Sequence, residues 1–370
     1  MKIKEEAYIV IQTLKDNGFE AYLVGGSVRD FLMNITPKDF DIATNAKPNE
    51  VEKIFEKTID TGASFGTITV LINKVQIEVT TYRIDGDYKD NRHPEGVAFT
   101  TNLIEDLKRR DFTINAIAYD GMEEFIDPFG GSIDIQNKII KGVGEPAKRF
   151  REDALRVLRA IRFSCQLGFE IEENTLKALK KTAYLIKNIS SERIREELKK
   201  IILSDYIENM YLLQFLSIDL DYKKIKNKPR ELETRLYLLG IKDEYMKALK
   251  FSNREINDVM NLHSSFVPVD RYEAKKLINK FGFENFYRIK ELYSLDYKKF
   301  ENIEEEPIFL KDLKIKGDDI INLGIVGKEI GEYLYLCLDA VHKDKANNDK
   351  AKLLEVINCK RQSQIQKKII

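Results

Sequence analysis

Residues 23–44 read LVGGSVRDFLMNITPKDFDIAT. The apolar start of this stretch reaches the glycine pair Gly25-Gly26, a pattern that predicts a strand followed by a tight turn. The next residues, SVRDFLM, predict the start of a helix with Ser27 as its N-cap, and KDFDIAT predicts a second strand. Two glycines before a helix allow backbone N–H groups to approach an anion closely, and the helix dipole favours negative charge there. An ordinary strand–helix turn is the alternative.

The residues around this stretch alternate between helical and strand patterns. Helices are expected at 4–18 and 48–57, a hairpin-like pair of strands at 66–72 and 75–83, and a helix followed by a strand within 103–120. Residues 84–100 are polar and rich in turn formers, which predicts a mobile loop. From about Lys148 glycine and proline become rare and helical patterns continue to the end. The sequence therefore predicts an α+β head with a small mixed β-sheet, followed by an all-α remainder.

Length and composition narrow the class of protein. A chain of 370 residues exceeds what one hydrophobic core usually holds, so two to four domains are expected. The cysteines Cys165, Cys337 and Cys359 lie far apart and form no CxxC pair, so neither a disulfide framework nor a zinc site is expected. The first residues are charged throughout and no apolar run is long enough for a membrane span. We expect a cytoplasmic protein without a membrane partner.

The net charge gives no general argument for a nucleic-acid partner, because 61 Lys and Arg residues balance 61 Asp and Glu residues. A local argument exists. Residues 138–162 contain eight basic residues and only three acidic ones. The basic residues are Lys138, Lys141, Lys148, Arg149, Arg151, Arg156, Arg159 and Arg162. The acidic residues are Glu145, Glu152 and Asp153.

Asp39 and Asp41 are candidate metal ligands. On a strand, side chains alternate, so both carboxylates would project from one face while Phe40 points to the other. Two like charges so close repel each other unless a cation shares them, and hard oxygen ligands favour Mg²⁺. A solvated acidic strand end is the alternative for this DxD pattern alone. Its occurrence ten residues after Arg29 of GGSVRD is much more specific.

Glu78 is a candidate third ligand. It interrupts the otherwise apolar segment Val75–Thr80, and a carboxylate in that context needs a partner. A neighbouring strand can bring it to Asp39 and Asp41. A Glu78 that simply faces solvent is the alternative.

The segment Arg109–Asn115 supplies further candidates. If a helix starts here, Asp111 and Asn115 are four residues apart and share one face. They can then bind ribose hydroxyls, with Arg110 on a phosphate, while the fork of donors on Arg29 holds a phosphate from the other side. A helix with surface charges and no function is the alternative.

The segment Arg151–Arg162 predicts a helix with a winding polar stripe of Asp153, Arg156, Arg159 and Arg162. Cytosine and adenine each display an amino donor beside a ring-nitrogen acceptor, and one Asp acceptor with one Arg donor matches that order. Guanine and uracil present the opposite order. The alternative is a set of surface ion pairs contributing about a few tenths of a kcal/mol each.

In chain order these groups resemble the class II CCA-adding enzyme and bacterial poly(A) polymerase family of the DNA polymerase β nucleotidyltransferase superfamily. The similarity covers roughly residues 20–200, and it weakens beyond about Ser204. The matching segments are LVGGSVRDFL, KDFDIAT, IEVTTYR, DNRHPEGVAF, EDLKRRDFTINAIAYD, DPFGG, REDALRVLRAIRF and ISSERIREEL.

The resemblance implies a polymerase β-like head at 1–138, a neck at 139–204, a body at 205–305 and a tail at 306–370. It also implies roles for individual residues. Two Mg²⁺ ions would be held by Asp39, Asp41 and plausibly Glu78. The triphosphate would be held by Gly26, Arg29 and Arg110. The base would be read by Asp153 and Arg156, helped by Arg159 and Arg162.

The activity implied is template-independent addition of C, C and A to the 3′ end of tRNA, using CTP and ATP and releasing pyrophosphate. Residues 84–100 resemble the family's flexible loop, which relatives that add only CC lack, so a CCA adder or an A adder is expected. Poly(A) synthesis and a catalytically inactive RNA-binding relative are the alternatives. The isolated histidines His93, His263 and His342 match no metal-binding pair and are expected to be structural or exposed.

Overall fold

The computed structural model describes residues 4–86, 96–344 and 346–369. The chain divides into two compact units. The first comprises Met1–Lys226 with Lys247–Phe251, and the second comprises Asn227–Met246 with Ser252–Ile370. The boundaries expected from the resemblance, at 138, 204 and 305, stay a prediction. No helix within the described ranges is long and apolar enough to cross a membrane.

The first unit begins with a seven-stranded mixed sheet in the order β3-β4-β5-β2-β1-β8-β9, as the α+β prediction requires. Only β2 and β5 are parallel neighbours among these strands, and the other pairs are antiparallel. The strands are β1 Ala21–Val24, β2 Asp41–Thr44, β3 Thr58–Gly62, β4 Thr67–Ile72, β5 Val75–Thr81, β8 Ala118–Tyr119 and β9 Phe125–Ile126.

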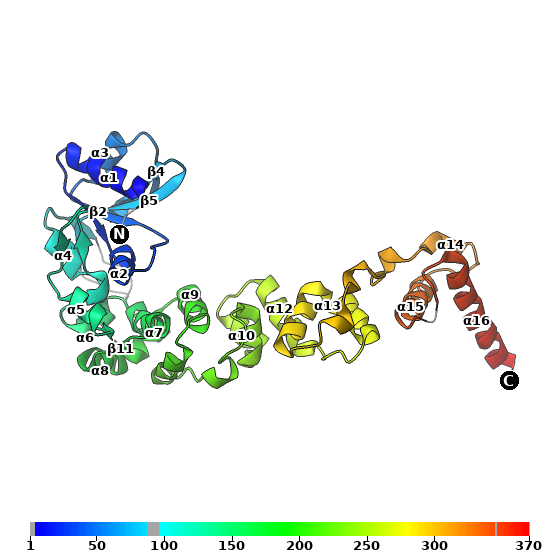
Figure 1. Ribbon diagram of the computed structural model, residues 1–370. Helices are drawn as coiled ribbons and strands as arrows, with labels where there is room; N and C mark the ends of the chain where they lie inside the picture. Colours follow the sequence, from blue (N-terminus) through cyan, green and yellow to red (C-terminus); the bar gives the residue numbers. More distant parts are fainter. Residues whose placement is uncertain (1–3, 87–95, 345, 370) are drawn as a thin grey trace. The chain divides into compact units, whose positions relative to one another are not determined.

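Short helices surround this sheet (Figure 1). The apolar side of α1, formed by Ala7, Val10, Ile11 and Leu14, is fully buried, which explains the helical periodicity of this segment. The helices of the head are α1 Glu5–Asp16, α2 Gly26–Leu32, α3 Pro48–Ile54, η1 Ala63–Phe65, α4 Leu103–Lys108, η2 Thr113–Asn115 and α5 Gly131–Gln136.

Two local predictions for the head were wrong. Helix α2 has Gly25 as its N-cap, while Ser27 lies inside the first turn and donates its hydroxyl to the Val24 carbonyl at 2.8 Å. The glycine takes the cap because its φ of 74° is in the left-handed region. Residues 84–100 are not loop throughout, because β6 Arg83–Asp85 pairs with β7 Val97–Phe99. The part of the predicted loop at 87–95 lies outside the described residues.

The rest of the first unit is almost entirely helical. The predicted face Ala154, Leu158, Ile161 and Cys165 is fully buried, which confirms it as the packing face of α7. One departure is β11, which pairs in parallel with β10. The elements are β10 Ile139–Ile140, α6 Pro146–Glu152, α7 Leu155–Leu167, β11 Glu170–Ile171, α8 Glu173–Thr182, η3 Ala183–Asn188, α9 Ser191–Ile202, η4 Ile207–Leu216 and η5 Tyr222–Lys224.

The second unit is helical and has two apolar cores. One includes Leu277 and Phe286 of α13, and the other includes Cys337 of α15 and Leu353 of α16. Helix α11 Asp243–Ala248 is divided between the two units. The other elements are α10 Leu232–Leu238, α12 Asn253–Ser264, α13 Arg271–Leu292, η6 Lys298–Phe300, η7 Ile303–Glu305, η8 Leu310–Asp312, α14 Gly317–Ile321, α15 Glu329–His342 and α16 Lys350–Ile369.

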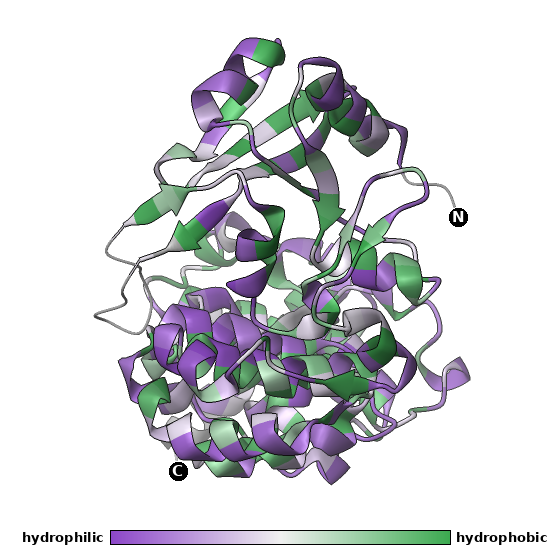
Figure 2. Cartoon of the chain, turned by 90° about the vertical axis from the view of Figure 1, so that its left-hand side faces the viewer, coloured by the Kyte–Doolittle hydropathy of each residue, from purple (hydrophilic) through white to green (hydrophobic). Residues whose placement is uncertain are grey.

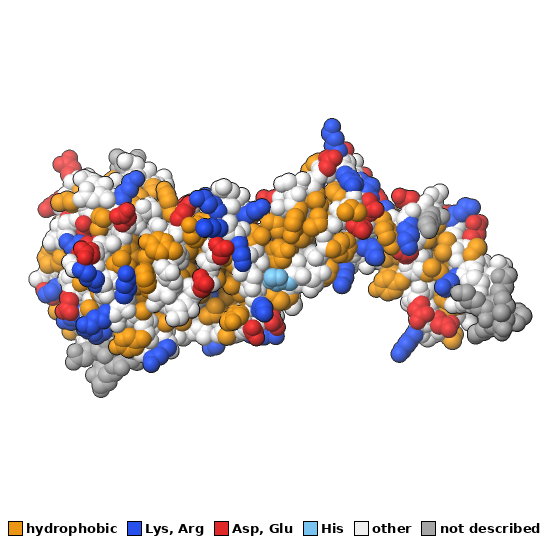
Figure 3. All heavy atoms as spheres, turned by 90° about the horizontal axis from the view of Figure 1, so that it is seen from below, with side chains coloured by type: hydrophobic (Ala, Val, Ile, Leu, Met, Phe, Trp, Pro, Cys, Tyr) orange, Lys and Arg blue, Asp and Glu red, His pale blue; other side chains and the backbone are white. Residues whose placement is uncertain are grey.

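Surface properties agree with the composition. Hydrophobic and hydrophilic residues alternate along the helices (Figure 2), as expected for helices with one buried side. On the face shown in Figure 3, cationic and anionic side chains are interspersed. His342 is buried and meets the backbone carbonyl of Ile308 at 3.2 Å, whereas His263 is exposed and meets that of Ile241 at 3.3 Å, so one is structural and the other lies at the surface. His93 lies outside the described residues.

Candidate active site

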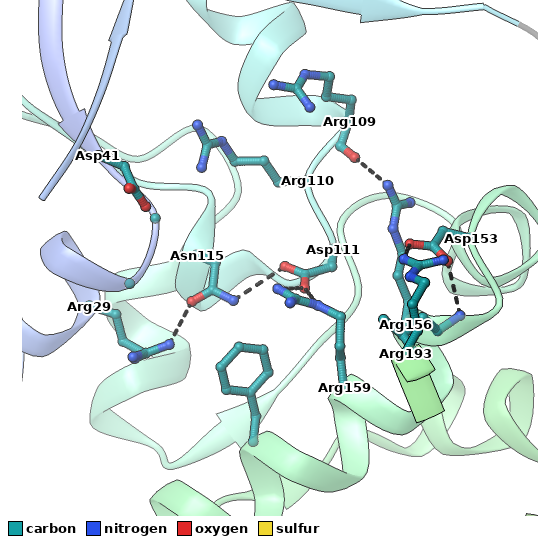
Figure 4. Close-up of a pocket in the computed structure, with 14 residues that line it drawn as sticks. Arg29, Asp41, Arg109, Arg110, Asp111, Asn115, Asp153, Arg156, Arg159 and Arg193 are labelled. Carbon is teal, nitrogen blue, oxygen red and sulfur yellow. Dashed lines mark hydrogen bonds and ion pairs between the residues drawn. The ribbon is translucent and has the colours of Figure 1, made fainter. Parts of the chain in front are cut away.

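A cleft of about 410 Å³ lies in the first unit, where the sheet meets helices α7 and α9 (Figure 4). It contains most of the residues singled out in the sequence and several that were not. Its lining residues are Gly25, Gly26, Arg29, Asp41, Arg109, Arg110, Asp111, Asn115, Asp153, Leu155, Arg156, Arg159, Phe163 and Arg193. Of the predicted set, Asp39, Glu78 and Arg162 do not line it.

The glycine turn after β1 brings backbone close to two charged groups. A Cβ atom on Gly25 would lie 3.3 Å from Nη1 of Arg110 and 3.5 Å from Oδ2 of Asp41. Its φ of 74° is also one that side chains disfavour. Glycine is therefore required at this position, and the turn exposes backbone beside a guanidinium and a carboxylate.

The candidate metal ligands lie at one edge of the cleft. Asp41 begins β2 and is the register partner of Glu78 on the parallel strand β5, so the expected approach of Glu78 is confirmed. Asp41 is partly buried and Glu78 is exposed. Burial, followed by the charge of Glu78, raises the pKa of Asp41 to about 6, although Arg110 opposes this shift. The charge of Asp39 adds to it.

The expectation that Asp39 and Asp41 share one strand was wrong. Strand β2 starts at Asp41, and Asp39 lies exposed in the bend before it. Phe40 is buried as expected, although it too precedes the strand. Among the described residues the strand pairing of β2 begins at Asp41, so the backbone of Asp39 follows the bend rather than the pleat. Across the described ranges, no three His, Cys, Asp or Glu side chains are placed to hold a metal ion by themselves.

The donor set nevertheless fits a hard divalent cation. Asp39, Asp41 and Glu78 offer only carboxylate oxygens, the ligands that Mg²⁺ and similar ions prefer. Their mutual repulsion, seen in the raised pKa of Asp41, is what a shared cation removes. Three carboxylates do not complete the coordination of such an ion, so coordination positions remain for oxygens of a substrate.

A chain of hydrogen bonds crosses the floor of the cleft from α2 to α7 (Figure 4). Arg29 donates to Oδ1 of Asn115 at 2.9 Å, and Nδ2 of Asn115 donates to Oδ1 of Asp111 at 3.2 Å. Arg159 donates to Oδ2 of Asp111 at 2.7 Å through Nε. Burial opposes ionisation of Asp111, but Arg159 and Arg156 together hold its pKa at about 2.

Asp111 and Asn115 therefore lie together as expected, but the predicted helix is wrong. Asp111 precedes η2, a 3₁₀ turn that starts only at Thr113. The Asp111 carboxylate also accepts from the backbone N–H of Phe112 at 2.9 Å, a local bond that competes with helix formation.

Arg110 lines the cleft and is held there by a buried carboxylate. Its Nη2 lies 3.2 Å from Oδ2 of the buried Asp106, which also binds Arg109. Burial of Asp106 is outweighed by the nearby Arg109 and Arg110, so the pKa of Asp106 is lowered. Within the described ranges the buried Nε of Arg110 has no hydrogen-bond partner. The Arg110 guanidinium is thus anchored to Asp106 through Nη2, while its Nη1 lies beside the Gly25 turn.

Asp153 and Arg156 face the cleft from the junction of α6 and α7. Asp153 is the C-cap of α6 with extended backbone, so the expected continuous helical stripe beginning at Asp153 was wrong. Arg156 donates to Oε2 of Glu152 at 3.0 Å and to the carbonyls of Arg149 at 3.2 Å and Arg109 at 3.0 Å. Asp153 is bound by Arg193, which the sequence did not single out.

Arg162 has a different environment from the other predicted arginines. It is buried and donates to Oε2 of Glu197 at 2.5 Å. Its guanidinium lies 4.0 Å from the ring centre of Phe163, and those of Arg29 and Arg159 lie 5.2 Å and 5.4 Å from the same ring. Phe163 was missed because it reads as a core residue of α7. Its signal was a position directly after Arg162 and four residues after Arg159.

The sheet, the acidic edge and the arginine-rich cleft define a nucleotidyltransferase. Residues 21–141 match the family described as Poly A polymerase head domain. Residues 168–214 match the family described as probable RNA and SrmB-binding site of polymerase A.

The chain belongs to the family of CCA-adding enzymes. It is 38% identical to the CCA-adding enzyme of Geobacillus sp. (strain WCH70) over 390 aligned positions, covering 95% of this chain and 96% of that protein. The CCA-adding enzyme of Listeria monocytogenes serotype 4b (strain F2365) is 38% identical, with coverage of 94% and 96%.

Solved structures agree with this assignment. The Bacillus stearothermophilus CCA-adding enzyme in complex with CTP has a TM-score of 0.84 and 30% identity, over 98% of both chains. The Thermotoga maritima CCA-adding enzyme complexed with tRNA has a TM-score of 0.68 over 97% of this chain and 96% of that chain. At 22% identity, the second similarity concerns the fold alone.

Proposed function

We propose that this protein adds C, C and A to the 3′ end of tRNA, taking the nucleotides from CTP and ATP, releasing pyrophosphate and using no nucleic-acid template. The observation that carries the proposal is the cleft itself. It joins the acidic edge at Asp41 to the glycine turn at Gly25 and to the polar pair Asp153 and Arg156. The nearly full-length similarity to CCA-adding enzymes supports the same activity.

The acidic edge is where the bond is made. Asp39, Asp41 and Glu78 would hold two Mg²⁺ ions, which supply a lowered pKa for the primer 3′-hydroxyl and charge neutralisation for the leaving pyrophosphate. Asp41 is the central ligand in this proposal, because it alone of the three lines the cleft. No side-chain nucleophile is required, since positioning and charge stabilisation supply most of the catalysis in phosphoryl-type transfer.

The triphosphate is held by Gly26, Arg29 and Arg110. The turn at Gly26 presents backbone, and the two guanidiniums offer charge-assisted donors on either side. Arg110 lines the cleft, and its Nη1 lies beside the Gly25 turn, where it can meet a phosphate. Asn115 is in reach of the same region and would contact ribose hydroxyls with its remaining amide N–H. Asp111 is engaged by its own neighbours and orients Asn115 for that contact.

The base is chosen by Asp153 and Arg156. Asp153 accepts from an exocyclic amino group and Arg156 donates to a ring nitrogen, an order that fits cytosine and adenine and refuses guanine and uracil. Arg159 and Arg162 of α7 support the base-reading pair through their ion pairs with Asp111 and Glu197.

The tRNA is held by shape and by its phosphates. The match at residues 168–214 to an RNA-binding family supports contact through the helices after α7. In this proposal the body at 205–305 and the tail at 306–370 hold the rest of the tRNA.

A substrate series tests the proposal. The protein is incubated with tRNA lacking its 3′ nucleotides, tRNA ending in C and tRNA ending in CC, with labelled CTP and ATP supplied separately and together. A CCA-adding enzyme completes all three when both nucleotides are present and stops after the last A. Extension of the CC-ending tRNA alone would assign A addition, and an extended A tract would assign poly(A) synthesis.

A further inference from the structure

Arg193 of α9 reaches into the cleft and binds Asp153, although it belongs to neither the acidic edge nor α7. We infer that Arg193 is a positioning residue that fixes the Asp153 carboxylate for base selection. The inference rests on the role proposed for Asp153, and it concerns how that side chain is held.

The contact between Arg193 and Asp153 is bidentate (Figure 4). Nη1 of Arg193 donates to Oδ1 of Asp153 at 3.2 Å, and Nη2 donates to Oδ2 at 2.8 Å. Two parallel hydrogen bonds between a guanidinium and a carboxylate fix the plane of the carboxylate as well as its position. The backbone N–H of Leu155 adds a third bond to Oδ1 at 3.0 Å.

This arrangement leaves a defined acceptor. Each carboxylate oxygen has two lone pairs. On Asp153, Oδ1 uses both, for Leu155 and Arg193, while Oδ2 uses one, for Arg193. One lone pair of Oδ2 therefore stays available. An exocyclic amino group donates to such an acceptor, whereas the carbonyl of uracil or guanine is repelled by it. Arg193 thus decides which oxygen and which direction remain for the base.

Helix α9 makes a second contact with the base-selecting segment. Arg193 and Glu197 are four residues apart on α9, so they project from the same side of the helix. Glu197 binds Arg162 of α7 at 2.5 Å, one turn from the contact of Arg193 with Asp153. Helix α9 therefore braces the base-selecting segment at two successive turns.

The position of Arg193 in its helix is electrostatically unfavourable unless an anion binds it. It lies in the first turn of α9, which begins at Ser191, and a cation is disfavoured near the N-terminus of a helix. The Asp153 carboxylate offsets that unfavourable placement. An arginine is needed at this position, because a lysine cannot form the bidentate contact with Asp153.

The test replaces Arg193 by lysine, which keeps the charge and removes the fork. Single-nucleotide extension of tRNA lacking its 3′ end is measured with CTP and with UTP, and kcat and KM are determined for each. We expect KM for CTP to rise about tenfold and the CTP-over-UTP preference in kcat/KM to fall about tenfold, as loss of about one good hydrogen bond gives. The value of kcat at saturating CTP is expected to stay close to that of the wild type.

Arg195→Lys is the matched control. Arg195 lies two residues along the same helix and contacts Glu196 and the Lys250 carbonyl, away from the cleft. It is expected to retain wild-type kinetics and selectivity. Thermal unfolding and tRNA binding are measured for both variants, and both are expected to match the wild type.

An Arg193→Lys enzyme with wild-type selectivity and wild-type KM for CTP would overturn the role of Arg193. If that variant does not fold, Arg193→Gln is judged by the same two quantities. A wild-type protein that does not extend tRNA with CTP would instead overturn the proposed function. The two failures are therefore separate results.

Discussion

Asp41 and Glu78 stand side by side in adjacent parallel strands, as direct register partners of β2 and β5. Their neighbours Ile42 and Val79, also partners, are buried, so the two acids occupy the other face of the sheet. Two carboxylates so close make each other harder to ionise, which contributes to the raised pKa of Asp41. The electrostatics of the site thus already indicate where a cation is required.

The first prediction concerns pH. Because burial and Glu78 raise the pKa of Asp41 to about 6, Asp41 becomes protonated as the pH falls through that value and can no longer serve as a ligand. We expect kcat/KM for nucleotide addition to fall there. Divalent metal competes with the proton, so the midpoint should move to lower pH as the Mg²⁺ concentration rises. Rate profiles at two Mg²⁺ concentrations measure this, and a midpoint independent of Mg²⁺ would contradict it.

The second prediction concerns stability without metal. The folded-state pKa of Asp41 exceeds its unfolded value, so its ionisation costs stability as the pH rises from about 4 to about 6. The raised pKa of Asp41 sets an upper bound of roughly 3 kcal/mol on this cost. We expect Asp41→Asn to raise the free energy of unfolding by part of that bound, about 1–2 kcal/mol, at about pH 8 without divalent metal.

Chemical denaturation with and without Mg²⁺ checks this. Mg²⁺ should stabilise the wild type and have little effect on Asp41→Asn. Glu52→Gln, an exposed substitution on α3, is the control and should behave as the wild type. A less stable Asp41→Asn protein in metal-free buffer would be inconsistent with the raised pKa.

The third prediction concerns the triphosphate. Arg110→Ala removes a charged donor that both nucleotides would use in the same way. We expect KM for CTP and ATP to rise together by about 10- to 100-fold, the effect of losing about 1.5–3 kcal/mol. Lys108→Ala is the control, since Lys108 lies at the surface and, within the described part of the chain, pairs with Glu105. A selective effect on one nucleotide would assign Arg110 to the base instead.

The fourth prediction concerns the network across the cleft floor. Arg159→Ala leaves the buried Asp111 carboxylate without its main cation. We expect a loss of about 3 kcal/mol in the free energy of unfolding, the lower end for a buried pair, because the Arg159 side chain is 34% exposed.

The pH dependence of that loss follows from the pKa of Asp111. Its folded-state value of about 2 lies below the unfolded value, so the stabilisation is present above about pH 4 and is lost as the pH falls toward 2. Denaturation of wild type and Arg159→Ala across this range should give converging curves. A constant difference down to the lowest pH would show that Arg159 stabilises by packing alone.

Much of this site was visible in the sequence because its motifs are local. Gly25, Arg29 and Asp41 fall within one strand–turn–helix–strand unit, and Phe40 is an apolar residue in a polar segment, which is enough to place it in the core. The approach of Glu78 also followed, since a lone carboxylate in an apolar strand needs a neighbour.

What the sequence could not supply depends on distant or competing contacts. Arg193 meets Asp153 across forty residues, and no spacing rule predicts that pairing. The start of β2 at Asp41 coincides with the end of its antiparallel partner β1 at Val24, a distant strand. The expected helix at Asp111 was replaced by a 3₁₀ turn, because its side chain bonds to the next backbone N–H.

The fifth prediction concerns nucleotide choice. Asp153→Ala removes the acceptor and Arg156→Ala removes the donor proposed to read the base. We expect both variants to incorporate UTP or GTP at a larger fraction of the CTP and ATP rates, measured by competition between labelled nucleotides on the same tRNA. An unaltered preference for CTP and ATP in both variants would remove the base-reading role from this pair.

The most direct test of the account is single-turnover addition of labelled ATP to tRNA ending in CC, by the wild type and by the protein carrying Asp39→Ala and Asp41→Ala together. tRNA binding is measured in the same samples. The account predicts rapid addition of one A by the wild type, and no addition by the double variant although it still binds tRNA. Addition of A by the double variant at the wild-type rate would contradict the assignment of the acidic edge as the site of bond formation.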